Sequence, residues 1–171
     1  MKLQIAPNNW SCMATSVAMA LDTQTANVVR LCGHSGDGLP WPPPFDHIRE
    51  GFHIHELIDV VWLYFSKTLT PFIRCPMVTP RDECPEQPAT FTECDAETRF
   101  IKRMWSRTGI LTGVVKSGCV EIGHAVAWDG HKIYDPRGYI YPFTARDKYG
   151  YEPDVFWMLG GPDGSASKIL A

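Results

Sequence analysis

The chain has 171 residues, of which 44% are hydrophobic and 20% are charged, and its formal net charge is −3 at pH 7. These values are ordinary for one globular domain large enough to bury a core. The sequence has no basic block, so it lacks the electrostatic footprint of a nucleic-acid-binding protein. No apolar run reaches the roughly 18 residues that a membrane span requires. We therefore expect a single domain over residues 1–171, with a flexible tail at 160–171 and neither nucleic acid nor a membrane as partner.

The six cysteines show no pattern typical of a metal site. No pair has Cys-x-x-Cys spacing, and three of them lie nine and ten residues apart in a Pro-rich stretch, which is poor spacing for zinc. The first seven residues lack the apolar core of a signal peptide, so we expect reduced thiols and a cytoplasmic location. The cysteines are Cys12, Cys32, Cys75, Cys84, Cys94 and Cys119.

Residues 8–21 predict a loop that becomes a buried helix. Ser11 can cap this helix by accepting a backbone N–H bond, and Cys12 then lies in the first helical turn. The helix dipole and the free N–H groups favour an anion there, so the thiol should ionise below its usual pKa of about 8.5. The alternative is a small buried hydrophobic residue without reactivity. The apolar positions of the helix are Met13, Val17 and Leu21, with Ala14 and Ala18 beside them.

The next elements are two helices and the loop between them. Residues 23–32 predict a short helix that Gly33 ends, and residues 53–66 carry the apolar period of a longer one. The loop between them contains Trp-Pro-Pro-Pro at 41–44, which is either a surface connector or a wall of a substrate cleft. His53 and His55 are two apart on the predicted helix, point in different directions and therefore should not share a metal.

The central part of the chain predicts an edge strand, a loop and a third long helix. Residues 68–79 contain two prolines, which suit an irregular edge strand, and residues 80–92 form a polar loop. Asp95 should cap a helix that runs to Arg107. Its inward positions are Phe100, Ile101, Met104 and Trp105.

From residue 110 onward the pattern changes to strands. Because helices come first and strands later, we expect an α+β fold with N-terminal helices packed on a C-terminal antiparallel sheet. The predicted strands are residues 110–115, 124–128, 132–134, 139–143 and 154–159.

Residues 123–136 carry the second chemically suggestive pattern. They predict a strand, a tight Asp-Gly turn and a second strand, so His124 and Asp135 should be neighbours. Together with Cys12 they provide a nucleophile, a base and a group that orients the base. The alternative is a structural hydrogen-bonded pair at a strand edge. Trp128 either flanks the histidine or is an ordinary buried tryptophan of the sheet.

The cysteine that opens a helix, the distant Gly-His-Ala-Val strand and the Tyr-Asp-Pro that follows resemble the papain-like cysteine peptidases, in particular the C39-like branch that includes bacteriocin-leader peptidases. The resemblance covers about residues 3–143, and residues 51–59 are similar to the second helix of that branch. The sequence departs from the family at Met13, where the family usually has Gly. Gln4, eight residues before Cys12, is the only glutamine available for the family's oxyanion position.

The resemblance implies a papain-like fold with the active site in the cleft between helices and sheet. It implies a cysteine peptidase that hydrolyses a peptide or isopeptide bond through a Cys12–His124–Asp135 triad and a thioester. Gln4 and the backbone N–H of Cys12 would hold the oxyanion. The enzyme would need no cofactor or metal, its partner would be a protein or peptide, and it would act in a bacterial cytoplasm, or in the host cytoplasm if viral. It implies nothing about the oligomeric state.

Several other functions use the same three residues. Amidases, deamidases and acyl transferases share the Cys-His arrangement, and a peptidase fold can also serve as a catalytically silent interaction module. We expect an enzyme because Cys12 and His124 are both present, whereas such modules usually lose one of the two.

Overall fold

The computed structural model describes residues 1–40, 48–74 and 93–161. Several sequence-based expectations fall outside these ranges: the Trp-Pro-Pro-Pro segment, the end of the predicted strand at 68–79, the loop at 80–92 and most of the tail. The described helices are α1 (Cys12–Ala20), α2 (Thr25–Cys32), α3 (Ile54–Phe65), α4 (Glu93–Met104) and the 3₁₀ helix η1 (Phe143–Tyr149).

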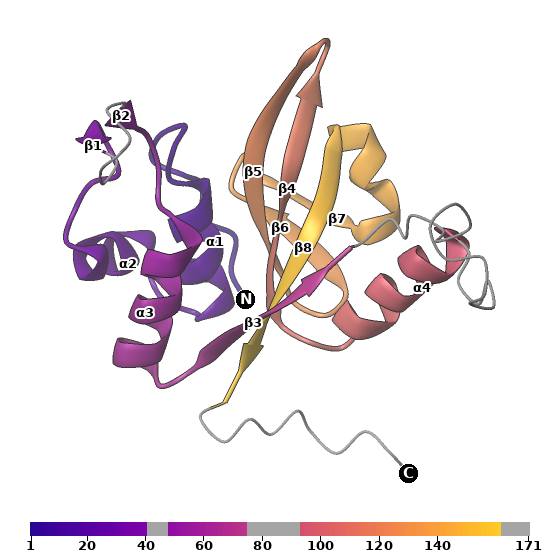
Figure 1. Cartoon of the computed structure of the whole chain (residues 1–171), viewed down its shortest axis with the longest axis horizontal. Helices are drawn as coiled ribbons and strands as arrows, with labels where there is room; N and C mark the ends of the chain where they lie inside the picture. The colour runs from indigo at the N-terminus through magenta and orange to yellow at the C-terminus, as the bar shows by residue number, and fades with distance from the viewer. Residues whose placement is uncertain (41–47, 75–92, 162–171) are drawn as a thin grey trace, which may run out of the picture.

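The described strands form one large sheet and one small one. The large sheet has six strands in the order β3-β8-β4-β5-β6-β7, and all neighbours are antiparallel. Helices α1–α3 lie on one side of it, and α4 and η1 lie on the other (Figure 1). The expected α+β architecture, with N-terminal helices packed against an antiparallel sheet, is confirmed. The strands are β1 (Leu39–Pro40), β2 (Ile48–Arg49), β3 (Thr68–Ile73), β4 (Gly109–Ser117), β5 (Val120–Trp128), β6 (Lys132–Asp135), β7 (Tyr139–Pro142) and β8 (Tyr151–Gly160); β1 pairs only with β2.

Small residues let α1 approach the sheet closely. Ala14 and Ala18 on the helix and Ala125 and Ala127 on β5 are all fully buried. Ala125 and Ala127 alternate with Val126 and Trp128, whose side chains belong to the core on the other side of the sheet. Because no large side chain separates α1 from β5, the first turn of the helix is held against the strand that carries His124.

The core on the opposite face is built around Trp128. Its ring is fully buried, and its Nε1 donates to the carbonyl oxygen of Met104 at the end of α4, 2.8 Å away. The ring also meets Phe143 of η1 edge-on. A buried indole with a satisfied N–H is structural. Trp128 is therefore an ordinary buried tryptophan of the sheet.

Helix ends follow the sequence signals with three exceptions, one at the start of α1 and one at each end of α4. Gly33 ends α2 with a φ of 79°, a left-handed conformation that glycine adopts without strain. Ser11, however, makes no capping bond to α1; its hydroxyl bonds Asn8 instead. Helix α4 begins at Glu93, so Asp95 lies inside the helix and the expected cap is wrong. The helix ends at Met104, three residues before the predicted end at Arg107.

Two tryptophans and the starts of two strands also differ from expectation. One of these strands is β8, which begins at Tyr151 rather than at residue 154. Trp105 is an expected inward position of the helix at 95–107, and Trp62 belongs to the apolar period expected over residues 53–66. Each is 53% exposed in the structure. Strand β5 begins at Val120, four residues before its predicted start. It pairs with β4 along its whole length, forming a hairpin that extends beyond the rest of the sheet (Figure 1). This extension carries few buried side chains, so hydrophobic patterning gives little sign of it.

None of the described helices is long and apolar enough to cross a bilayer. In the same part of the chain, Cys12, Cys32 and Cys119 are free thiols.

Candidate active site

The site lies where β5 and β6 separate. The two strands pair only at their closed end, through Ala127 with Tyr134 and Trp128 with Ile133. Beyond that point no strand of the described part of the chain pairs with this edge of β5, and α1, which packs against β5, brings its first residue to the opening. Cys12 from the helical half and His124 from the sheet therefore line one pocket.

His124 and Asp135 are hydrogen-bonded neighbours, as the sequence predicted. The turn between their strands is not the expected two-residue Asp-Gly turn, because Trp128 pairs with Ile133 rather than with His131. His124 Nε2 lies 2.9 Å from Asp135 Oδ1, and the two side chains are 9% and 0% exposed. Gly113, the β4 partner of His124, sits where the register between β4 and β8 shifts. A Cβ at Gly113 would lie 2.0 Å from the carbonyl oxygen of Glu152, so only glycine lets β8 approach behind the histidine.

Asp135 has two further side-chain partners that the sequence analysis did not identify. Arg137 grips both carboxylate oxygens, with Nη2 2.7 Å from Oδ2 and Nε 3.1 Å from Oδ1, and its backbone N–H donates to Oδ1. The hydroxyl of Tyr141 donates to Oδ2 at 3.0 Å. Burial acts to raise the pKa of Asp135, but the bonds from His124 and Arg137 outweigh it and hold the pKa below its usual range. Asp135 is therefore a fixed carboxylate.

The electrostatics of Cys12 and His124 favour a thiolate beside an imidazolium. Burial acts to raise the pKa of Cys12. Hydrogen bonding to His124, the charge of His124 and the backbone N–H groups of Ala125 and Met13 outweigh burial and lower it. Burial acts to lower the pKa of His124, but Asp135 and Cys12 raise it to about 9. Since Asp135 occupies Nε2, the imidazole presents Nδ1 to the sulfur.

The pocket around these groups has a volume of about 550 Å³. It is bounded by the N-terminal segment on one side and the β4–β5 hairpin on the other, with the turn after β6 closing one end. Its lining residues are 5–9, Cys12, Val115, 122–124, Pro136 and Arg137.

Gln4 is not brought to the site. Its Oε1 accepts from the backbone N–H of Thr25 at 2.9 Å and from the Thr25 hydroxyl at 3.0 Å, while its Nε2 donates to the carbonyl oxygen of Thr23 at 2.6 Å. The side chain thus ties the N-terminal segment to the start of α2, and Gln4 is absent from the pocket lining. The expected oxyanion role does not fit this position.

His53 and His55, the two histidines considered above as possible metal ligands, do not line the pocket. His53 precedes α3 and caps it in a reciprocal capping box with Glu56. Because His53 stands outside the helix, its ring stacks on that of His55 at 5.0 Å, so the expectation that they point apart was wrong. Within the described ranges no three His, Cys, Asp or Glu side chains gather closely enough to hold a metal ion.

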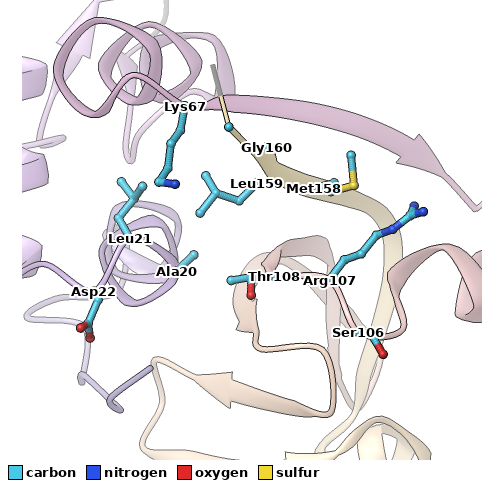
Figure 2. A pocket seen from close by; sticks show the side chains of 11 residues that line it. Ala20, Leu21, Asp22, Lys67, Ser106, Arg107, Thr108, Met158, Leu159 and Gly160 are labelled. Carbon is cyan, nitrogen blue, oxygen red and sulfur yellow. The ribbon is translucent and has the colours of Figure 1, made fainter. Parts of the chain in front are cut away.

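A second cavity of about 440 Å³ lies at the far end of α1, between the end of β8, the start of β3 and the loop before β4. Figure 2 shows Lys67, Leu21 and Leu159 pointing toward one another, with Arg107 farther along the wall. None of Cys12, His124 and Asp135 lines it.

The ion pair between Arg137 and Asp135 should contribute measurably to stability. Replacing Arg137 with Ala should lower the free energy of unfolding by about 2–3 kcal/mol at pH 7, because a fully buried carboxylate loses its bidentate partner. Urea unfolding measures the change. The matched control is Arg107→Ala, since none of the described residues forms an ion pair with Arg107, and we expect a change within about 0.5 kcal/mol. An equal decrease in the free energy of unfolding in the two variants would contradict a stabilising role for the Arg137–Asp135 ion pair.

Comparison with known proteins adds no relative: no family model, no curated protein and no solved structure matches this chain.

Proposed function

We propose that this protein is a papain-like thiol hydrolase of the C39-like type, and specifically a cysteine peptidase. The observation that carries the proposal is that Cys12 and His124 line one pocket while His124 is hydrogen-bonded to the buried carboxylate of Asp135 behind it. The same chain of groups would serve any acyl transfer through a thioester. A peptide substrate is favoured over a small amide by the edge of β5 beside the pocket, which does not pair with β6 there.

The acylation step uses the three side chains in turn. The Cys12 thiolate attacks the substrate carbonyl carbon, and the C=O π pair moves to oxygen. The backbone N–H of Cys12, at the first position of α1, is a donor for this oxyanion. As the tetrahedral intermediate collapses, the C–N bond breaks and His124 Nδ1 gives its proton to the leaving amine. The acyl group is left on sulfur as a thioester.

Hydrolysis of the thioester regenerates the enzyme. Neutral His124 takes a proton from water, whose oxygen attacks the thioester carbon, and the C–S bond breaks to release the acid and the thiolate. Asp135 accepts from Nε2 throughout, which fixes the tautomer and stabilises the imidazolium. Arg137 and Tyr141 keep Asp135 ionised and in place.

The open edge of β5 suits an extended peptide. Gly118 and Cys119 form a two-residue loop between paired Ser117 and Val120, so every second residue of β5 directs its N–H and C=O away from β4. Ala125 follows this alternation, and its backbone N–H is one of the groups that lower the pKa of Cys12. Gly123 has the same orientation, lines the pocket and has open space where a Cβ would be. A substrate backbone could add to this edge as a strand.

The choice between peptide and small amide is testable. A peptide that extends several residues on both sides of the scissile bond should have a kcat/KM about 30- to 150-fold above that of a capped single-residue amide. Two backbone hydrogen bonds of about 1–1.5 kcal/mol each give this factor. The measurement uses the best-cleaved member of a quenched-fluorescent peptide library and its truncated amide. Methylating one backbone nitrogen at a time should reduce cleavage at alternate positions. Equal cleavage of both substrates would indicate an amidase instead.

A further inference from the structure

The oxyanion site has one donor from the backbone and lacks the expected second one. If the proposed function holds, the negative oxygen of the tetrahedral intermediate needs more than the N–H of Cys12, because each preorganised donor contributes about 10²–10³ in rate. Gln4, the candidate from the sequence, is bonded to Thr23 and Thr25. The second donor must therefore come from another residue in the pocket.

Asn8 has the chemistry and the fixed orientation that this role requires. It lines the pocket with Cys12 and His124. Its Oδ1 accepts from the backbone N–H of Trp10 at 3.3 Å and also from the hydroxyl of the buried Ser11. Two donors on one oxygen fix the plane of the amide, so the NH₂ group points the opposite way. No residue in the described parts of the chain accepts from that Nδ2.

The bond from Ser11 also accounts for an irregularity at the start of α1. Ser11 is at the N-cap position and yet makes no capping bond. Its hydroxyl is turned toward Asn8 instead, which leaves the N–H groups of the first turn free of a side-chain acceptor. Both effects favour an anion at the helix start: the first-turn donors stay available, and the Asn8 amide is held rigid.

We propose that Asn8 is a catalytic residue, whose Nδ2–H donates to the substrate oxyanion together with the backbone N–H of Cys12. Ser11 is then a positioning residue that orients Asn8. The neighbouring Asn9 also lines the pocket, but it is exposed and makes no hydrogen bond among the described residues that would orient it.

The test measures stabilisation of the oxyanion separately from the reactivity of the Cys12 thiolate. Asn8→Asp keeps the accepting oxygen and loses the donor, and Asn8→Ala loses the donor without adding charge. Both should lower kcat on the best-cleaved library peptide by about 10²–10³ and weaken a peptide aldehyde of that sequence by a similar factor, because the aldehyde adduct places an oxygen at the oxyanion position. Alkylation of Cys12 by iodoacetamide forms no oxyanion, so its plateau rate should stay close to wild type. That rate also shows that the variants are folded.

Two matched variants complete the experiment. Asn9→Ala removes a side chain from the same pocket wall and should lower kcat and aldehyde affinity far less than the Asn8 variants do. Gln4→Ala should lower thermal stability, because α2 loses its contact with the N-terminal segment, and should leave aldehyde affinity unchanged. Normal turnover in both Asn8 variants, or a loss confined to Asn9→Ala or Gln4→Ala, would overturn the proposal. If wild-type Cys12 itself shows no rapid alkylation near pH 7, the proposed function fails instead, so the two failures are distinguishable.

Discussion

Replacing His124 with Ala is expected to lower kcat by about 10⁴-fold or more and to move the midpoint of Cys12 alkylation upward to about pH 8.5. In the proposed mechanism the histidine is the base, and its positive charge also lowers the pKa of Cys12. Without it, the N–H groups of Ala125 and Met13 still favour the thiolate, while burial opposes ionisation. The thiol then behaves much like an ordinary cysteine.

The measurement is the rate of iodoacetamide labelling at each cysteine against pH, read by peptide mass spectrometry. Burial and the charge of Glu56 raise the pKa of Cys32 to about 11, so Cys32 should label far more slowly than Cys12 in the same sample. His131→Ala is the matched control, because His131 is exposed in the turn between β5 and β6. An unchanged midpoint in His124→Ala, or labelling of wild-type Cys12 only above pH 8, would rule out the ion pair.

If the proposed function holds, the Cys12–His124 pair should set the pH range of activity. The thiolate forms as pH rises through the lowered pKa of Cys12, and the imidazolium is lost as pH rises through about 9. The rate should therefore be bell-shaped, with its alkaline limb near pH 9. For stability, the raised pKa of His124 contributes fully below about pH 6.5, and this contribution disappears as pH rises through about 9.

Asp135→Asn should lower kcat by about 10⁴-fold. The amide can still accept from His124 Nε2, but it carries no charge to stabilise the imidazolium. It also presents an NH₂ group where Arg137 and Tyr141 donate. Because Asp135 is one cause of the raised pKa of His124, its loss should move the alkaline limb of activity below pH 9. The pH profile of kcat measures both effects.

A control variant in the adjacent turn distinguishes the effect of Asp135→Asn on His124 from a general loss of stability. Asp129 also accepts two bonds, from the backbone N–H groups of His131 and Lys132 at 2.8 Å and 2.7 Å, but it lies outside the pocket. Asp129→Asn should weaken the turn and leave the alkaline limb near pH 9. A full rate in Asp135→Asn, or an equal shift of the limb in both variants, would show that Asp135 has no part in orienting His124.

The sequence alone was enough for features that depend on neighbours along the chain. The apolar and small residues at 13–21 place Cys12 at the start of a buried helix, since spacing by three and four puts them on one face. The alternation and the turn residues at 123–136 correctly predict two strands joined by a short turn, which brings His124 and Asp135 together. The exact register was wrong, because Trp128 pairs with Ile133 and not with His131, the partner that a two-residue Asp-Gly turn would give. Both predictions rest on local geometry, and the structure brings these residues together.

Only the tertiary structure decided which polar side chains serve the pocket. Gln4 and Asn8 lie on the same N-terminal segment, and each could donate from its amide. Gln4 meets the start of α2, whereas Asn8 is turned by Ser11 at the start of α1. Arg137 and Tyr141, the latter on the next strand β7, both donate to the carboxylate of Asp135 and offset the cost of burying it. An amide or guanidinium bonds whatever acceptor folding brings near it, and residue type and spacing do not specify that acceptor.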